Sequence, residues 1–131
     1  MPQIVDPSSR PRSVLLVEDD DAVRRSLQLL LRSRGYDVRA HASGNGLAHD
    51  PQALRCECLI ADLMMPQTDA LQLLTELRGA NWGGKAILIS GFLDPRREQK
   101  ARAAGYDAVL AKPISDSVLV RTVGELLPAS V

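Results

Sequence analysis

The chain has 131 residues, with 16 basic and 16 acidic side chains and therefore a formal net charge of zero. A nucleic-acid-binding domain needs an excess of positive charge, and the aromatic residues that could stack on bases make up only 3% of this chain. Direct nucleic-acid binding is thus not expected. Hydrophobic residues amount to 45%, as in a globular domain with one core.

The two ends of the chain differ in composition from its centre. Residues 1–12 contain three prolines and no long apolar run, so we expect a flexible N-terminal tail. Residues 13–127 are expected to form a single domain, and residues 128–131 a short C-terminal tail. No apolar run approaches the roughly 20 residues of a membrane span, which predicts a cytoplasmic protein without membrane contact. Cys56 and Cys58 are too few for a zinc site and are expected to be reduced.

The first predicted elements are a strand over 13–17 and a helix that ends near residue 34. The strand is apolar and stops at four consecutive carboxylates, Glu18 to Asp21. Asp20 or Asp21 can cap the helix. Apolar residues recur at helical spacing and are expected to face the core, with polar residues on the opposite face. The core set is Val23, Leu27, Leu30 and Leu31, and the opposite set is Arg24, Arg25, Gln28 and Arg32.

The rest of the chain repeats this alternation of strand and helix. Further strands are expected over 36–40, 58–61, 85–90 and 106–111, and further helices over 47–54, 70–78, 96–104 and 116–127. Two glycines and Pro51 predict a short, irregular helix over 47–54. The helix over 70–78 is expected to bury three leucines: Leu71, Leu74 and Leu77. Five strands alternating with five helices predict an α/β fold, an open doubly wound parallel sheet covered on both faces.

Polar side chains lie at the carboxyl ends of four of these strands: Glu18 with Asp19, then Asp62, Ser90 and Lys112. Ligands of an open α/β sheet bind at this edge, where the direction of winding reverses. Any one of these residues alone is more often structural than functional. Together they fit one chemistry, because the three carboxylates can bind Mg²⁺ and Asp62 can accept a phosphoryl group. Ser90 and Lys112 would then neutralise the phosphoryl oxygens.

Four short motifs surround these residues: Leu16-Val17-Glu18-Asp19-Asp20, Asp62-Leu63-Met64-Met65-Pro66 with Asp69, Ile89-Ser90-Gly91, and Ala111-Lys112-Pro113. From about Ser13 to Leu127 the sequence closely resembles the receiver domain of bacterial two-component response regulators. The resemblance implies a flavodoxin-like, five-stranded parallel sheet of order 2-1-3-4-5, flanked by five helices, with a cis peptide before Pro113. By the same resemblance, Asp62 is the phosphoacceptor, Ser90 the switch hydroxyl and Lys112 the family's lysine. The metal ligands would be Glu18, Asp19, Asp62 and the backbone carbonyl of Met64.

As a receiver domain, the chain would take a phosphoryl group from a sensor histidine kinase or a phosphotransfer protein onto Asp62, with Mg²⁺ as cofactor. Phosphorylation would remodel the surface of the fourth helix, the fifth strand and the fifth helix, where a downstream protein or a linked output domain binds. Val109 and the fifth helix are also where we look for a homodimer. The few residues after Leu127 cannot form an output domain, so the chain either acts alone or is the receiver portion of a longer protein.

Two other functions remain open at this point. A receiver-like interaction module that works without phosphorylation would share the fold, but it would not need Asp62, Ser90 and Lys112 together. A phosphatase with an aspartyl intermediate would use a second acid two residues after the nucleophile, where the chain has Met64. We therefore expect a regulatory domain and not an enzyme that turns over repeatedly.

Three positions depart from the usual receiver pattern. Glu18 stands where aspartate is commoner, and its longer side chain is expected to preserve a water-mediated metal contact. Ala70 stands where the family often has glycine, so the backbone there must avoid a positive φ. Val109 occupies the position of the usual aromatic gate residue, and a packing shift would have to replace a ring flip.

Two apolar residues bear on the lifetime of the phosphorylated state. Met64 lies two residues after Asp62, and Phe92 lies two residues after Ser90. Both are expected to flank the route by which water attacks the aspartyl phosphate, and neither side chain can orient that water. Slow self-dephosphorylation is therefore expected, because in-line hydrolysis needs a positioned nucleophile.

Overall fold

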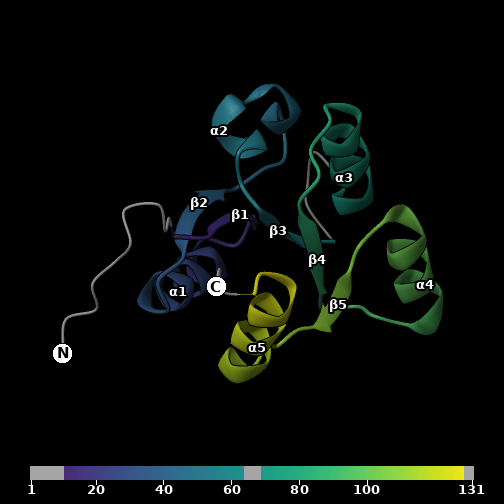
Figure 1. The fold of residues 1–131 in the computed structure, drawn as a ribbon. Coiled ribbons are helices and arrows are strands. Elements are labelled where there is room, and N and C mark those ends of the chain that lie inside the picture. Colours follow the sequence, from purple (N-terminus) through teal and green to yellow (C-terminus); the bar gives the residue numbers. More distant parts are fainter. Residues whose placement is uncertain (1–10, 64–68, 129–131) are drawn as a thin grey trace.

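The computed structural model describes residues 11–63 and 69–128, in which a central sheet alternates with helices (Figure 1). The strands are β1 (Ser13–Val17), β2 (Asp37–His41), β3 (Cys58–Asp62), β4 (Lys85–Ser90) and β5 (Ala108–Ala111). The helices are α1 (Asp21–Ser33), α2 (Pro51–Leu54), α3 (Ala70–Gly79), α4 (Pro95–Ala104) and α5 (Asp116–Leu126). A single 3₁₀ turn, Leu47–His49, precedes α2.

The five strands are parallel and run in the order β2-β1-β3-β4-β5, which confirms the predicted topology. In the register of the sheet, Val17 lies opposite His41 on one side and Ala61 on the other, and Asp62 lies opposite Ile89. The carboxyl ends of the strands are thus level with one another. The winding direction changes beside β1 and β3, which is where an open α/β sheet binds ligands.

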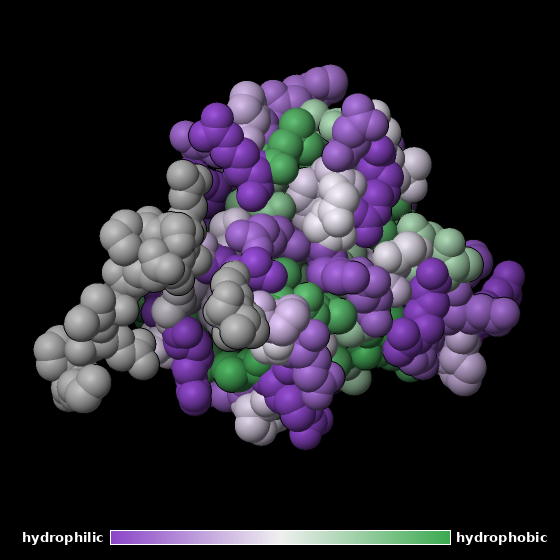
Figure 2. Space-filling view, in the orientation of Figure 1, coloured by the Kyte–Doolittle hydropathy of each residue, from purple (hydrophilic) through white to green (hydrophobic). Residues whose placement is uncertain are grey.

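Helices cover both faces of the sheet, because successive strand residues point to opposite sides. Val14, Leu16 and Ile60 face a layer formed by α1 and α5. Leu15 and Leu59 face the layer of α3, α4 and the segment around α2. On the face shown in Figure 2, hydrophilic residues cover much of the surface, and hydrophobic residues show mainly between the elements. The three central strands, β1, β3 and β4, are almost wholly buried, which explains why their sequences are continuous apolar runs. The edge strands β2 and β5 are only partly buried.

The segment between β2 and β3 is irregular, as predicted. Gly46 takes a positive φ of 76° ahead of the 3₁₀ turn. Asp50 then caps a helix of only four residues by accepting a hydrogen bond from the Gln52 amide.

The structure corrects two details of the expected fold. Tyr106 does not begin the fifth strand but lies two residues before it, buried, with its hydroxyl donating to the Ala70 carbonyl at 2.6 Å. A buried phenol needs such an acceptor, and this need outweighs its strand preference. On α3, Leu73 is fully buried whereas Leu71 is only partly buried. The helix packs between the sheet and its neighbours, so its apolar face is wider than one leucine stripe.

Cys56 and Cys58 are free and buried, as expected for reduced cysteines. Burial raises the pKa of Cys56 to about 11 and that of Cys58 to about 12, so both stay protonated thiols. Among residues 11–63 and 69–128, no helix is long and apolar enough to cross a membrane. Residues 1–10 and 129–131 lie outside the described part of the chain, so the tails predicted at 1–12 and 128–131 stay predictions.

Candidate functional site

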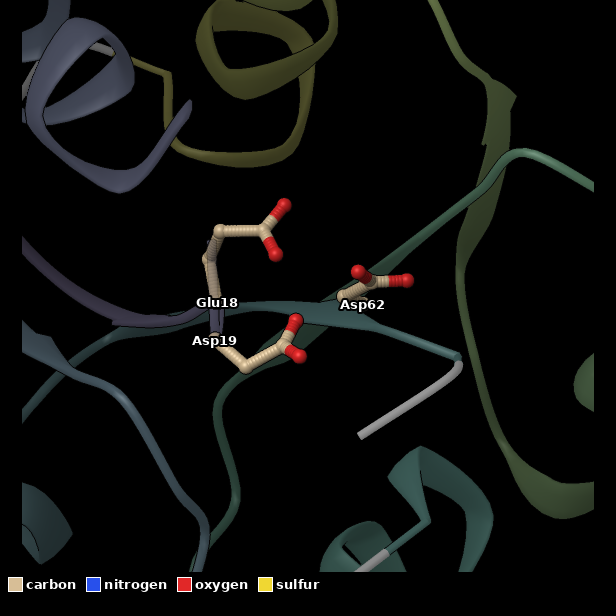
Figure 3. A group of neighbouring side chains, drawn as sticks. All are labelled: Glu18, Asp19 and Asp62. Carbon is tan, nitrogen blue, oxygen red and sulfur yellow. The ribbon is translucent and has the colours of Figure 1, made fainter. Parts of the chain in front are cut away.

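Three carboxylates meet at the carboxyl edge of the sheet (Figure 3). Glu18 and Asp19 follow β1 directly, and Asp62 is the last residue of the neighbouring strand β3. One carboxylate oxygen from each lies within 4.8 Å of the others. The sequence brings them together because two adjacent parallel strands end at the same level and both end in acids.

Lys112 joins two of these carboxylates. Its Nζ donates to Glu18 Oε1 at 2.7 Å and to Asp62 Oδ2 at 2.9 Å. The lysine follows β5, and its backbone N–H donates to the carbonyl of Ser90 at 2.8 Å, which extends the pairing of β5 with β4. The peptide between Lys112 and Pro113 is cis, as predicted. The ammonium group of Lys112 thus reaches the carboxylates of Glu18 and Asp62 from the end of β5, which lies two strands beyond β3 in the sheet.

Burial sets the charge balance of the site. Glu18 is fully buried, and this burial raises its pKa to about 7, although the hydrogen bond from Lys112 works in the opposite direction. The nearby carboxyl of Asp62 adds to the increase. For Lys112, burial lowers the pKa, but the hydrogen bonds to Glu18 and Asp62 outweigh it and the pKa is raised. The site therefore holds more carboxylates than the ammonium group alone can balance.

The donor set fits a hard divalent cation. Mg²⁺ prefers oxygen ligands and usually takes one or two carboxylates together with water. Glu18, Asp19 and Asp62 offer three oxygens close enough to share one ion, and a cation there would offset their mutual repulsion. Met64, whose backbone carbonyl we expect as a further ligand, lies outside the described residues.

Ser90 belongs to the same edge. It is fully buried at the end of β4, one residue beyond Ile89, the register partner of Asp62. Its hydroxyl oxygen accepts a hydrogen bond from the Phe92 amide at 3.1 Å. A hydroxyl that accepts this bond still carries a proton that it can donate to a phosphoryl oxygen.

Residues 14–124 match the family model described as the response regulator receiver domain. The chain belongs to this family. Receiver domains are the regulatory domains of two-component systems. They bind Mg²⁺ at an acidic pocket and interact with histidine kinases and output domains. The acidic edge described above corresponds to such a pocket.

Curated relatives carry the same domain within longer chains. The sensor kinase CckA of Brucella abortus is 37% identical over 117 residues, which are 88% of this chain and 12% of the kinase. The transcriptional regulatory protein FixJ of Azorhizobium caulinodans is 33% identical over 117 residues, or 89% of this chain and 54% of FixJ. This receiver domain thus spans about half the length of FixJ and a small part of CckA.

Solved structures confirm the fold of the receiver domain. Chemotaxis protein CheY4 of Vibrio cholerae superimposes with a TM-score of 0.81 at 23% identity, covering 88% of this chain and 98% of CheY4. The receiver domain of the Francisella response regulator 1452 gives a TM-score of 0.80 at 24% identity, covering 88% and 95%. At such low identity the likeness concerns the fold alone.

The two aspartates after the acidic pair have the structural role that the sequence predicted. Asp20 is the N-cap of α1, since its Oδ1 accepts a hydrogen bond from the Val23 amide at 3.0 Å. Asp21 opens the helix and forms an ion pair with Arg24. Of the two candidates for the cap, the structure selects Asp20.

Sequence reasoning missed Arg24. Helical periodicity placed it on the polar face of α1, but its side chain turns back to the loop that carries the acidic pair. Its Nη1 donates to the Glu18 carbonyl at 2.9 Å and lies 3.5 Å from the Asp19 carbonyl. The signal that could have revealed it is its position in the first turn of a helix that follows an acidic run.

Proposed function

We propose that this receiver domain is a phosphorylation-controlled switch that takes a phosphoryl group onto Asp62. The phosphodonor would be a sensor histidine kinase or a phosphotransfer protein. Mg²⁺ would be held by Glu18, Asp19, Asp62 and the backbone carbonyl of Met64. The observation that supports this most strongly is the Lys112 ammonium group, which lies between the buried carboxylates of Glu18 and Asp62.

The proposed step is a direct phosphoryl transfer. A carboxylate oxygen of Asp62 forms a bond to phosphorus while the bond between phosphorus and the donor's histidine nitrogen breaks, and that nitrogen takes up a proton. Lys112 and the Ser90 hydroxyl would stabilise the negative charge on the phosphoryl oxygens. When bound, Mg²⁺ supplies further positive charge for the same oxygens.

The signal would leave the site through the surface of α4, β5 and α5. On α4 most side chains are exposed and many are basic: Arg96, Arg97, Lys100 and Arg102. Val109 on β5 is partly buried and packs against the core beneath α3 and α4, so a packing change at this residue can reach that layer. A downstream protein or a linked output domain is the proposed partner there, and a homodimer through β5 and α5 is a second use of the same surface.

The phosphorylated state is expected to be long-lived. Phe92 is 68% exposed, and its apolar ring offers no group that can orient water. Met64 is equally apolar, so we predict that replacing it by asparagine (Met64→Asn) shortens the lifetime of the aspartyl phosphate. Loss of phosphate from the purified, phosphorylated protein measures this lifetime. A wild-type lifetime of seconds would contradict the prediction.

One incubation separates the proposed switch from its alternatives. The protein is mixed with Mg²⁺ and a small phosphodonor such as acetyl phosphate, and both bound and released phosphate are followed. The switch predicts one phosphoryl group per chain and slow release. An interaction module that works without phosphorylation predicts no labelling, and a phosphatase predicts continuous phosphate release. The cytoplasmic location expected from the sequence stays a prediction.

A further inference from the structure

The loop after β1 is held from both sides. A trans peptide group points its carbonyl and its N–H in opposite directions. The Asp19 carbonyl and the Asp20 N–H belong to one such group. The carbonyl lies 3.5 Å from Arg24 Nη1, and the N–H donates to Glu18 Oε2 at 3.2 Å. Arg24 thus contacts one end of the peptide group whose other end orients the Glu18 carboxylate.

The preceding peptide group is anchored more firmly. Its carbonyl, that of Glu18, accepts from Arg24 Nη1 at 2.9 Å. The guanidinium is itself fixed by its ion pair with Asp21, and the Arg24 backbone N–H donates to the Asp20 carbonyl at 2.9 Å as α1 begins. A planar guanidinium can contact several neighbouring acceptors at the same time, here the Glu18 carbonyl and the Asp21 carboxylate. A lysine ammonium on its flexible stem does this less well.

Both oxygens of the Glu18 carboxylate therefore have partners that depend on local geometry. Lys112 donates to Oε1, and the Asp20 N–H donates to Oε2. If the loop turned, Glu18 would lose the second contact, and Asp19 would change its direction relative to Asp62. The three carboxylates would then no longer share a common point.

We infer that Arg24 is a positioning residue of the Mg²⁺ site. It holds the peptide groups between residues 18 and 20 so that Glu18 and Asp19 present their carboxylates toward Asp62. It acts through the backbone and does not contact the transferred phosphoryl group. The inference rests on the proposed function, because it assigns Arg24 to the same metal site.

The first readout needs no metal. Amide hydrogen exchange of Asp20 is measured by NMR in the wild-type protein, in Arg24→Ala and in Arg25→Ala. Arg25 is the adjacent, exposed arginine of α1 and serves as the matched control. Loosening of the loop in Arg24→Ala is expected to speed Asp20 exchange about fivefold to tenfold, while Arg25→Ala exchanges like the wild type.

The second readout is the dissociation constant of Mg²⁺, obtained by titration of the same samples. Arg24→Ala is expected to bind Mg²⁺ about tenfold more weakly, and Arg24→Lys to fall between it and the wild type. Raising Mg²⁺ to saturation should restore most of the phosphorylation rate, since the reacting groups are intact. Arg25→Ala should keep the wild-type affinity.

Several results would overturn the role of Arg24. Unchanged Asp20 exchange together with unchanged Mg²⁺ affinity in Arg24→Ala would do so. Full recovery of both values in Arg24→Lys would show that the charge suffices and that positioning does not matter. If Arg24→Ala does not fold, Arg24→Lys decides the question in the same way. If the wild-type protein itself does not bind Mg²⁺, the proposed function fails, and Asp20 exchange still tests whether Arg24 holds the loop.

Discussion

The charged groups at the two edges of the sheet have opposite surroundings. At the carboxyl edge, Glu18 is fully buried beside Asp62, and both depend on the ammonium group of Lys112. Burial raises the pKa of Glu18 to about 7, which means that its ionised form is costly in the metal-free protein. The ionised Glu18 carboxylate therefore lowers the free energy of unfolding of the metal-free protein.

At the amino edge, ahead of β3 and β4, a cation is held by neutral partners. Arg78 donates to the carbonyls of Trp82 at 3.0 Å and Gly84 at 2.8 Å, and its guanidinium carbon lies 4.8 Å from the centroid of the indole ring. The Trp82 ring donates in turn to the Cys56 carbonyl at 2.7 Å. These contacts satisfy buried polar groups without bringing like charges together.

This difference indicates that the amino edge contributes mainly to stability and the carboxyl edge mainly to the proposed function. The amino edge closes the core beneath the strands, whereas the carboxyl edge concentrates repulsive groups where a cation and a phosphoryl group are expected. Substitutions at the amino edge should therefore change the free energy of unfolding and leave the site intact. Substitutions of the site residues Glu18, Asp19 and Asp62 at the carboxyl edge should impair Mg²⁺ binding and phosphorylation.

The largest effect on stability is expected from Trp82→Ala. It removes a buried indole and leaves Arg78 without its stacking partner, so the free energy of unfolding should fall by about 3–5 kcal/mol. Urea denaturation measures this loss. Trp82→Phe, which keeps a ring but removes the hydrogen bond to Cys56, should cost less. Mg²⁺ affinity should not change in either variant that remains folded. A weakened affinity would contradict the expectation that the amino edge affects stability without affecting the site.

A smaller effect is expected from the pH dependence that Glu18 causes. Its folded-state pKa lies above the ordinary value of 4.5, so the folded protein binds the proton more tightly than the unfolded chain does. Metal-free protein should therefore lose stability as pH rises from about 4.5 to 7, by about 3 kcal/mol, because one unit of pKa is about 1.4 kcal/mol.

Urea denaturation at pH 5 and pH 8 measures that loss in the wild-type protein, in Glu18→Gln and in the exposed control Glu125→Gln. Glu18→Gln should lose less stability than the wild type over this range, and the control should match the wild type. Mg²⁺ should reduce the wild-type loss at pH 8. Equal slopes in all three proteins would show that Glu18 is not destabilised by burial.

The smallest effect is expected from the helix cap beside the acidic pair. Asp20→Ala removes the acceptor of the Val23 amide and should cost about 1 kcal/mol of unfolding free energy. Asp21→Ala should cost less, because Asp21 is highly exposed and is not the cap. Neither should prevent phosphorylation at saturating Mg²⁺, whereas Asp19→Ala should abolish it. If the phosphorylation of Asp20→Ala and Asp19→Ala were equally impaired, the division of this acidic run would be wrong.

Much of the fold follows from the sequence because the central strands of the sheet are buried on both faces. The central strands, such as Cys58–Asp62, consist almost wholly of apolar residues, and each ends at or directly before a polar residue that marks the carboxyl edge. The candidate site could be assembled for the same reason, since parallel strands align their ends. The strand order came from the family resemblance, because alternation of strands and helices alone does not specify it.

Other features depend on contacts that periodicity does not encode. Arg24 occupies a polar position of α1, but its long side chain reaches the preceding loop, and counting residues along a helix does not reveal that reach. Tyrosine has a high strand propensity, yet the position of Tyr106 is set by a hydrogen bond to the Ala70 carbonyl, 36 residues earlier in the chain. Such long-range pairs appear only once the layers are packed.

The most direct test of the account is where the phosphoryl group goes. Wild-type protein and Asp62→Asn are incubated with Mg²⁺ and acetyl phosphate, and the intact mass of each is measured. The account predicts one phosphoryl group on the wild-type protein, dependent on Mg²⁺, and none on Asp62→Asn. Equal labelling of the two proteins, or no labelling of a folded wild-type protein that binds Mg²⁺, would contradict it.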